Sequence, residues 1–93
     1  MSSAPDSERV LTAAIAHHRA GRLAEAETLC RSACDAAPND ARAFHLAGVI
    51  AHQLRRNDAA ALIGRAVALR PDWVEAHNDR GVILAANGLL PEA

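Results

Sequence analysis

The sequence predicts an all-α protein built from helix-turn-helix units that recur along the chain and stack side by side. First, similar small residues recur at a nearly constant interval: Ala14 corresponds to Gly48 after 34 positions, and Ala33 corresponds to Ala66 after 33. A period of about 34 is typical of stacked helical repeats, which form a core only by packing on one another. Second, alanine is abundant and favours helix. Third, runs of the β-branched and aromatic residues typical of strands are scarce.

The first repeat, residues 7–40, is expected to follow a disordered leader of residues 1–6, which are small and polar. Its first helix runs from Ser7, with Glu8 in the first turn, to about Ala20, and Gly21 ends it. Its second helix runs from about residue 23 to residue 37, and Pro38 stops it. The residues of this second helix that face inward are spaced by three and four, namely Ala26, Leu29, Cys30 and Ala33.

The second repeat, residues 41–73, has helices over about residues 41–54 and 58–69, and Pro71 closes it. The inward residues of the first of these helices are Phe44, Ala47, Gly48 and Ala51. Gly48 costs about 1 kcal/mol against alanine inside a helix, so we expect a neighbouring helix to lie close to it. The partial third repeat, residues 74–93, has a helix over about residues 74–87, with Gly81 in the place of Gly48, and then the start of a sixth helix.

The second repeat is one residue shorter than the first. The residue is lost between Gly48 and Leu62, because the offset from the first repeat is 34 at Gly48 and 33 at Leu62. A deletion inside a helix rotates everything after it by about 100°. We therefore assign the deletion to the turn, and predict that residues 55–57 form a tight connection and that Ala59 takes the place of Ala26.

Composition and charge exclude several classes of protein. The net charge is −1 with both signs interspersed, which is unlike the basic surface of a nucleic-acid binder. No stretch is apolar for long enough to span a membrane, and the first residues are too short and polar for a secretory signal. Cys30 and Cys34 lie four apart on one helix, too far for a disulfide, so we expect reduced thiols and a cytoplasmic protein.

These residues resemble the tetratricopeptide repeat family. The likeness rests on Ala47-Gly48, the turn glycines 21 and 88, Glu25-Ala26 with its echo Glu92-Ala93, and the prolines 38 and 71. The sequence from His45 to His52 and from Glu75 to Asn78 resembles that of bacterial proteins that carry such arrays ahead of a transferase domain. O-linked N-acetylglucosamine-transferase-like proteins are one such group. The resemblance implies a right-handed superhelical solenoid and a non-catalytic protein-interaction scaffold. Departures from the family pattern are His77 for a large aromatic, Arg80 for leucine and Arg55 for a turn glycine.

The resemblance also implies a concave groove, lined by the first helix of each repeat, that holds a peptide or a partner helix. The period assigns to it Leu11, Ile15, His18, Arg19, Arg42, His45, Val49, His52, Gln53, Glu75, Asn78, Val82 and Ala86. Leu11, Ile15 and Val49 stand where carboxylate-binding members carry Lys and Asn, which argues against that specificity. Asp79, next to Asn78, stands where transferase-type arrays carry a ladder asparagine. The alternative for all of these residues is a solvated face without a ligand.

Metal binding and catalysis find little support. His45 and His52 share a helical face, but no two histidines are spaced for a zinc site on one helix, and no orienting group accompanies a cysteine-histidine pair. We predict no cofactor, no metal and no enzyme activity.

A second function of a different class is self-association. The fifth helix offers an apolar stretch whose partner helix is not complete, because the sequence stops at Ala93 just inside the sixth. A face of this kind tends to be covered by another chain, so a homodimer through Val82, Ile83, Leu84 and Ala85 is the alternative, and the chain is expected to be a fragment of a longer protein.

Overall fold

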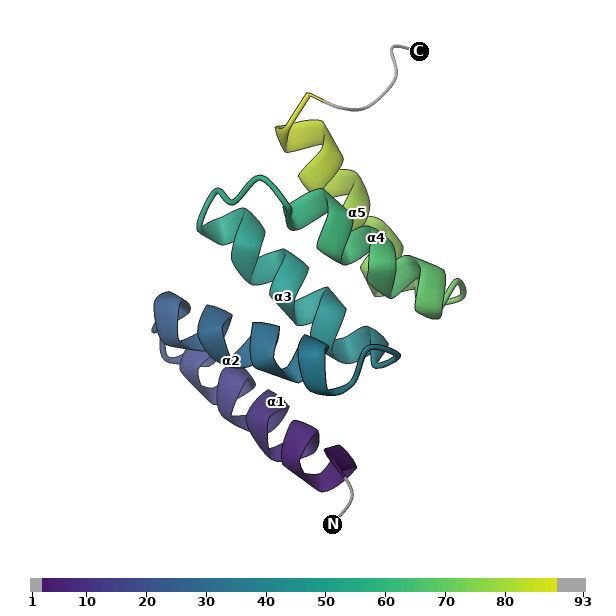
Figure 1. The fold of residues 1–93 in the computed structure, drawn as a ribbon. Coiled ribbons are helices and arrows are strands. Elements are labelled where there is room, and N and C mark those ends of the chain that lie inside the picture. Colours follow the sequence, from purple (N-terminus) through teal and green to yellow (C-terminus); the bar gives the residue numbers. More distant parts are fainter. Residues whose placement is uncertain (1–2, 89–93) are drawn as a thin grey trace.

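The computed structural model describes residues 3–88, with side chains from residue 7, and this part of the chain forms five helices and no strand. They are α1 (Ser3–Arg19), α2 (Leu23–Ala36), α3 (Ala41–Gln53), α4 (Ala59–Leu69) and α5 (Val74–Ala86). Figure 1 shows them following one another along an elongated body, which measures 50 × 27 × 19 Å. The all-α repeat architecture expected from the sequence is confirmed.

Each helix packs mainly on the helix that precedes or follows it in the chain. The first helices of successive repeats also meet, since α1 contacts α3 and α3 contacts α5. Helix α3 is therefore the centre of the stack, with neighbours on both sides (Figure 1).

Helix α1 begins at Ser3, four residues before the start at Ser7 that the sequence predicts. Pro5 falls in the first turn, where the backbone N–H groups have no partner within the helix, so its missing N–H is tolerated. The expected start of a sixth helix lies outside the described residues.

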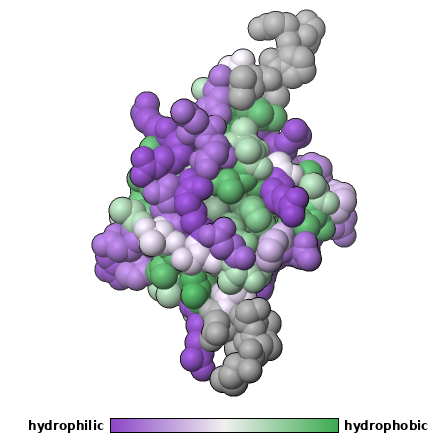
Figure 2. Space-filling view, in the orientation of Figure 1, coloured by the Kyte–Doolittle hydropathy of each residue, from purple (hydrophilic) through white to green (hydrophobic). Residues whose placement is uncertain are grey.

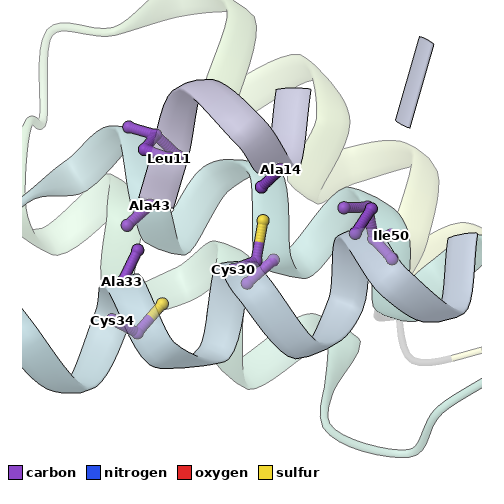
Figure 3. Packing of buried hydrophobic residues seen from close by; sticks show 9 residues of the cluster. Leu11, Ala14, Cys30, Ala33, Cys34, Ala43 and Ile50 are labelled. Carbon is purple, nitrogen blue, oxygen red and sulfur yellow. The ribbon is translucent and has the colours of Figure 1, made fainter. Parts of the chain in front are cut away.

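The core is made of small side chains in two clusters. The larger one joins Leu11 and Ala14 of α1, Cys30 and Ala33 of α2, and Ile50 of α3, together with their neighbours (Figure 3). The smaller one joins Ala51, Ala59, Ile63 and Ile83. Most residues expected to face inward are buried, whereas Leu29 and Phe44 are half-buried and pack against the edge of the larger cluster.

Gly48 lies at a close contact between α3 and α4. A Cβ atom at this position would lie 2.9 Å from the backbone nitrogen of Ile63 and 3.1 Å from its Cβ. The close approach expected at Gly48 is confirmed, and it involves backbone that cannot move aside without shifting α4.

The turn after α1 is closed by a glycine in the left-handed conformation. Gly21 has φ of +81°, the Arg22 N–H donates to the carbonyl of His17 and the Gly21 N–H donates to that of His18. The turn after α3 repeats this geometry with a non-glycine residue: Arg55 has φ of +60°, the Arg56 N–H donates to Ala51 and the Arg55 N–H donates to His52. These are the paired bonds of a Schellman motif.

The expected tight connection at residues 55–57 is wrong. Residues 54–58 separate α3 from α4, whereas residues 20–22 are enough to separate α1 from α2. The deletion is absorbed by a later helix start, because Asp58 stays outside the helix and forms an ion pair with Arg31 at 2.8 Å. Ala59 is 1% exposed and takes the buried place of Ala26, as predicted.

The same ion pair belongs to a network that joins α2 to this connection. Arg31 donates to Glu27 and to both carboxylate oxygens of Asp58, and Arg56 donates to both oxygens of Glu27. The hydrogen bond from Arg56 to Glu27 is the main cause that lowers the pKa of Glu27, and the bond from Arg31 has the same effect on the pKa of Asp58. The network holds the α3–α4 connection against α2.

Both cysteines are buried and free, whereas the sequence predicted an inward position for Cys30 only. Figure 3 shows the two sulfur atoms among the alanines of the core. Burial raises the pKa of Cys30 to about 12 and that of Cys34 to about 11. Among the described helices, none is both long enough and apolar enough to cross a bilayer.

Candidate functional site

The first helices of the repeats are joined by polar side chains that repeat with the period of the sequence. Arg42 at the start of α3 pairs with Glu8 of α1. His18 Nε2–H near the end of α1 donates to Gln53 Oε1 at the end of α3, at 2.8 Å. His45 Nε2–H on α3 donates to the carboxylate of Asp79 on α5, at 2.6 Å. Helices α1, α3 and α5 therefore present one continuous face.

His45 lies at the best-supported point of this face. Its ring lies 4.6 Å from the ring of Trp73, centroid to centroid, and the guanidinium of Arg70 lies 4.9 Å from the centre of the same Trp73 ring. Asp79 accepts the hydrogen bond from His45 on the other side. These contacts fix the ring of His45 between α5 and the α4–α5 connection.

Most of the residues expected in the groove are accessible to some degree. The exposed ones are Arg19, Arg42, Gln53, Glu75, Asn78, Val82 and Ala86, and the half-buried ones are Ile15, His18, His45, Val49 and His52. Four of them, namely His18, Arg42, His45 and Gln53, use hydrogen bonds to hold neighbouring helices together.

Leu11 does not belong to this surface. It is 3% exposed and lies in the core among Ala14, Ala33 and Ala43, so the helical period placed it about one position too far from the core. Ile15 is intermediate, because it packs against the same cluster from its edge.

The stretch expected to self-associate divides in the same way. Ile83 is 2% exposed and packs with Ile63 inside the second cluster, so it is not available to another chain. Val82 is 60% exposed and Ala85 is exposed, while Leu84 is half-buried. A Cβ atom on Gly81 would meet nothing within 4 Å, in contrast to Gly48.

A hollow of about 760 Å³ opens between the ends of α3 and α5. It is lined by His52 and Gln53, by the turn residues Arg55, Arg56 and Asn57, and by Asn87 with its neighbour Ala86. Our groove assignment included only the first two and Ala86. The sequence did mark Arg55 as unusual, because the equivalent positions of the chain carry glycine. It contained no comparable indication that Asn57 and Asn87 would line a hollow. Figure 2 shows one broad face of the molecule, with an apolar area over the middle of the stack and hydrophilic residues around it.

The histidines do not gather into a metal site. In the described part of the chain, no group of three or more His, Cys, Asp or Glu side chains is placed to hold a metal ion. His77 donates from Nε2 to the carbonyl of Pro71 at 2.6 Å and so secures the α4–α5 connection.

In a comparison with protein families, the family model described as Tetratricopeptide repeat matches residues 10–41 and 51–93. Comparison with curated proteins and with solved structures gave no match.

Proposed function

Since this chain belongs to the tetratricopeptide repeat family, whose repeats generally mediate protein–protein interactions and are generally non-catalytic, we propose that it is a non-catalytic scaffold that binds a peptide segment of a partner protein. The binding surface is the face formed by α1, α3 and α5. The observation that carries the proposal is the set of contacts that join these helices, His18 with Gln53, His45 with Asp79 and Arg42 with Glu8. They hold the three helices in register before a ligand arrives, which lowers the entropy lost on binding.

The chemistry of this face suits a mixed peptide. Val49 and Val82 offer apolar contact, Arg19 and Asn78 offer exposed polar groups, and His52 is half-buried. A short segment with alternating apolar and polar side chains would meet both kinds of group.

The proposal is tested by selecting binders from a displayed library of short peptides, with the whole chain as target, and mapping the bound peptide by amide chemical shifts. We expect shifts at His18, Val49 and Asn78. Asn78→Arg should weaken binding, because it places a large side chain on the proposed binding face. Ala61→Arg on α4 is the matched control, since it adds the same cation at an exposed helical position outside that face, and it should leave binding unchanged. Shifts confined to α2 and α4 would refute the proposal.

Two reduced, buried cysteines further support a reducing compartment, and we propose a cytoplasmic location on that ground. Thiol oxidation of the folded protein is disfavoured as well, since burial keeps both thiols protonated.

Self-association through α5 is the second candidate. The observation in its favour is the open slot at Gly81 beside Val82, which matches the position where Gly48 receives Ile63. Sedimentation over a wide range of concentration tests it: Val82→Asp should abolish a dimer, and a strictly monomeric wild-type chain at millimolar concentration would exclude it.

A further inference from the structure

The two edges of the stack carry opposite charge, although the net charge of the chain is close to zero. Residues 17–22 and 52–58 hold four arginines and three histidines against one acid, Asp58, which is paired with Arg31. Residues 35–40 and 70–75 hold four acids, namely Asp35, Asp40, Asp72 and Glu75, against one arginine. The contact between His18 and Gln53 joins the two basic turns into one edge.

The hollow between the ends of α3 and α5 lies on this basic edge. Arg55, Arg56, Asn57, His52, Gln53 and Asn87 line it, and all of them carry hydrogen-bond donors or, for histidine, a ring that donates in one tautomer or the other. Among residues 7–88, whose side chains the structure describes, no carboxylate lines the hollow. It is therefore matched to groups that accept hydrogen bonds and carry negative charge.

Arg55 supplies the free cation of the hollow. The guanidinium of Arg56 is paired with Glu27, whereas the side chain of Arg55 makes no hydrogen bond or ion pair with any residue that the structure describes. Its guanidinium is thus available for two parallel bonds to a carboxylate.

The backbone of Arg55 gives a second, independent observation. The equivalent residues after α1 and after α5 are glycines, Gly21 and Gly88, and all three residues have positive φ. Stability alone would favour glycine here as well, because left-handed backbone costs an L-residue about 1–2 kcal/mol. Residues held in unfavourable backbone conformations cluster at functional sites. The arginine at this position therefore suggests that its side chain has a role, such as binding a ligand.

We propose that this hollow binds an acidic segment of a protein partner, with Asp or Glu carboxylates of the partner on Arg55 and the neighbouring amide groups. The inference rests on the proposed function, because His52 and Gln53 border both the groove and the hollow, and it names the chemistry of the partner. A nucleic acid fits less well, since a long polyanion would extend from a short basic edge toward the acidic one.

The test is a titration of the isotope-labelled whole chain with hexaglutamate, followed through amide shifts. We expect shifts at residues 52–57 and 86–88, none from hexaglutamine, and weaker binding as salt is raised. Equal shifts from hexaglutamine, shifts centred on residues 35–40, or no shifts at millimolar peptide would overturn the proposal. Tighter binding of a thymidine hexanucleotide than of hexaglutamate would overturn the assignment to a protein partner.

Arg55→Gly is the decisive variant, because glycine relieves the backbone at this position and loss of binding cannot then be due to unfolding. It should weaken hexaglutamate binding about fivefold, the equivalent of one exposed charge pair. Arg9→Gln removes the same charge from an exposed position on α1 and should leave binding unchanged. Equal binding by Arg55→Gly and the wild type would refute the role of the hollow.

The two proposals fail separately. If library peptides bind the α1–α3–α5 face but hexaglutamate does not bind, the groove stands and the acidic specificity falls. If hexaglutamate shifts residues 52–57 while no library peptide shifts Val49 or Asn78, the hollow is the binding site and the groove assignment falls.

Discussion

Gly48 and Gly81 occupy the same position of successive repeats but meet different surroundings. A side chain at Gly48 would press on the backbone of Ile63, while one at Gly81 would meet nothing within 4 Å. The two glycines thus separate the cost of a close approach from the cost of glycine in a helix.

Gly48→Ala should destabilise the fold by about 1–3 kcal/mol, because the added methyl group overpacks the α3–α4 contact. Gly81→Ala should stabilise it by up to about 1 kcal/mol, since alanine is the better helix former. Urea unfolding followed by circular dichroism measures both, and equal shifts of the two midpoints would contradict the packing argument.

Among the described residues, Arg55 is the non-glycine residue that adopts a left-handed backbone conformation. Arg55→Gly should raise the free energy of unfolding by up to about 1 kcal/mol, because relief of the left-handed backbone exceeds the extra freedom of glycine in the unfolded chain. Gly21→Ala is the mirror experiment and should destabilise, as Gly21 has φ of +81° and no side chain to lose. Thermal melts of both variants report the difference, and a loss of stability in Arg55→Gly would mean that the arginine side chain stabilises the turn.

At the scale of the element, α2 carries its two thiols on the buried face. Below pH about 8.5 a thiol is neutral in the folded and in the unfolded chain, so the stability it contributes is fully present. Above that pH the unfolded chain ionises first, because burial holds the pKa of Cys34 at about 11 and of Cys30 at about 12 in the fold. Stability should therefore fall as pH rises from about 9 toward those values.

The sequence makes this alkaline effect easy to isolate. It contains no tyrosine and no lysine, so above the range of the terminal amine the cysteines are the groups that titrate before arginine. The double variant Cys30→Ala with Cys34→Ala should lose the alkaline slope, measured by urea unfolding at several pH values. Reaction of both wild-type thiols with a thiol reagent at the rate of the unfolded chain would contradict their burial.

The α3–α4 connection shows why element boundaries depend on contacts outside the element. By the period, the second helix of repeat two should start as early as that of repeat one. It starts instead at Ala59, because Asp58 pairs with Arg31 and Arg56 pairs with Glu27, both across the interface with α2.

At the scale of the whole molecule, stability is a chain of neighbour contacts, so it is highest where a helix has neighbours on both sides. Helix α3 packs on α2 and α4 and touches α1 and α5, whereas α5 has α4 as its main neighbour. We expect amide hydrogen exchange to be slowest at Ile50 and Ala51 and faster at Val74–Ala86. Uniform protection along the five helices would indicate a single cooperative unit instead.

The candidate site was only partly predictable. The helical period identified the helices that form the face, and it identified Gly48 and Ala59 as points of close packing. It misplaced Leu11 and Ile83, because a periodic pattern gives a helical face to within about one residue, and a buried position and a groove position are neighbours at that resolution. Arg55 was noted as a departure, but its meaning depended on the hollow beside it.

What the sequence by itself determined is the class of the fold, the order and type of the five helices, and the stacking that the period near 34 requires, since these follow from local preference and repetition. Which side chains remain free was decided only by the tertiary structure. The side chains of His18, Arg42 and His45 form hydrogen bonds with neighbouring helices, and that of Arg55 does not. The reason is that pairing between elements depends on distances that no pattern along the chain contains.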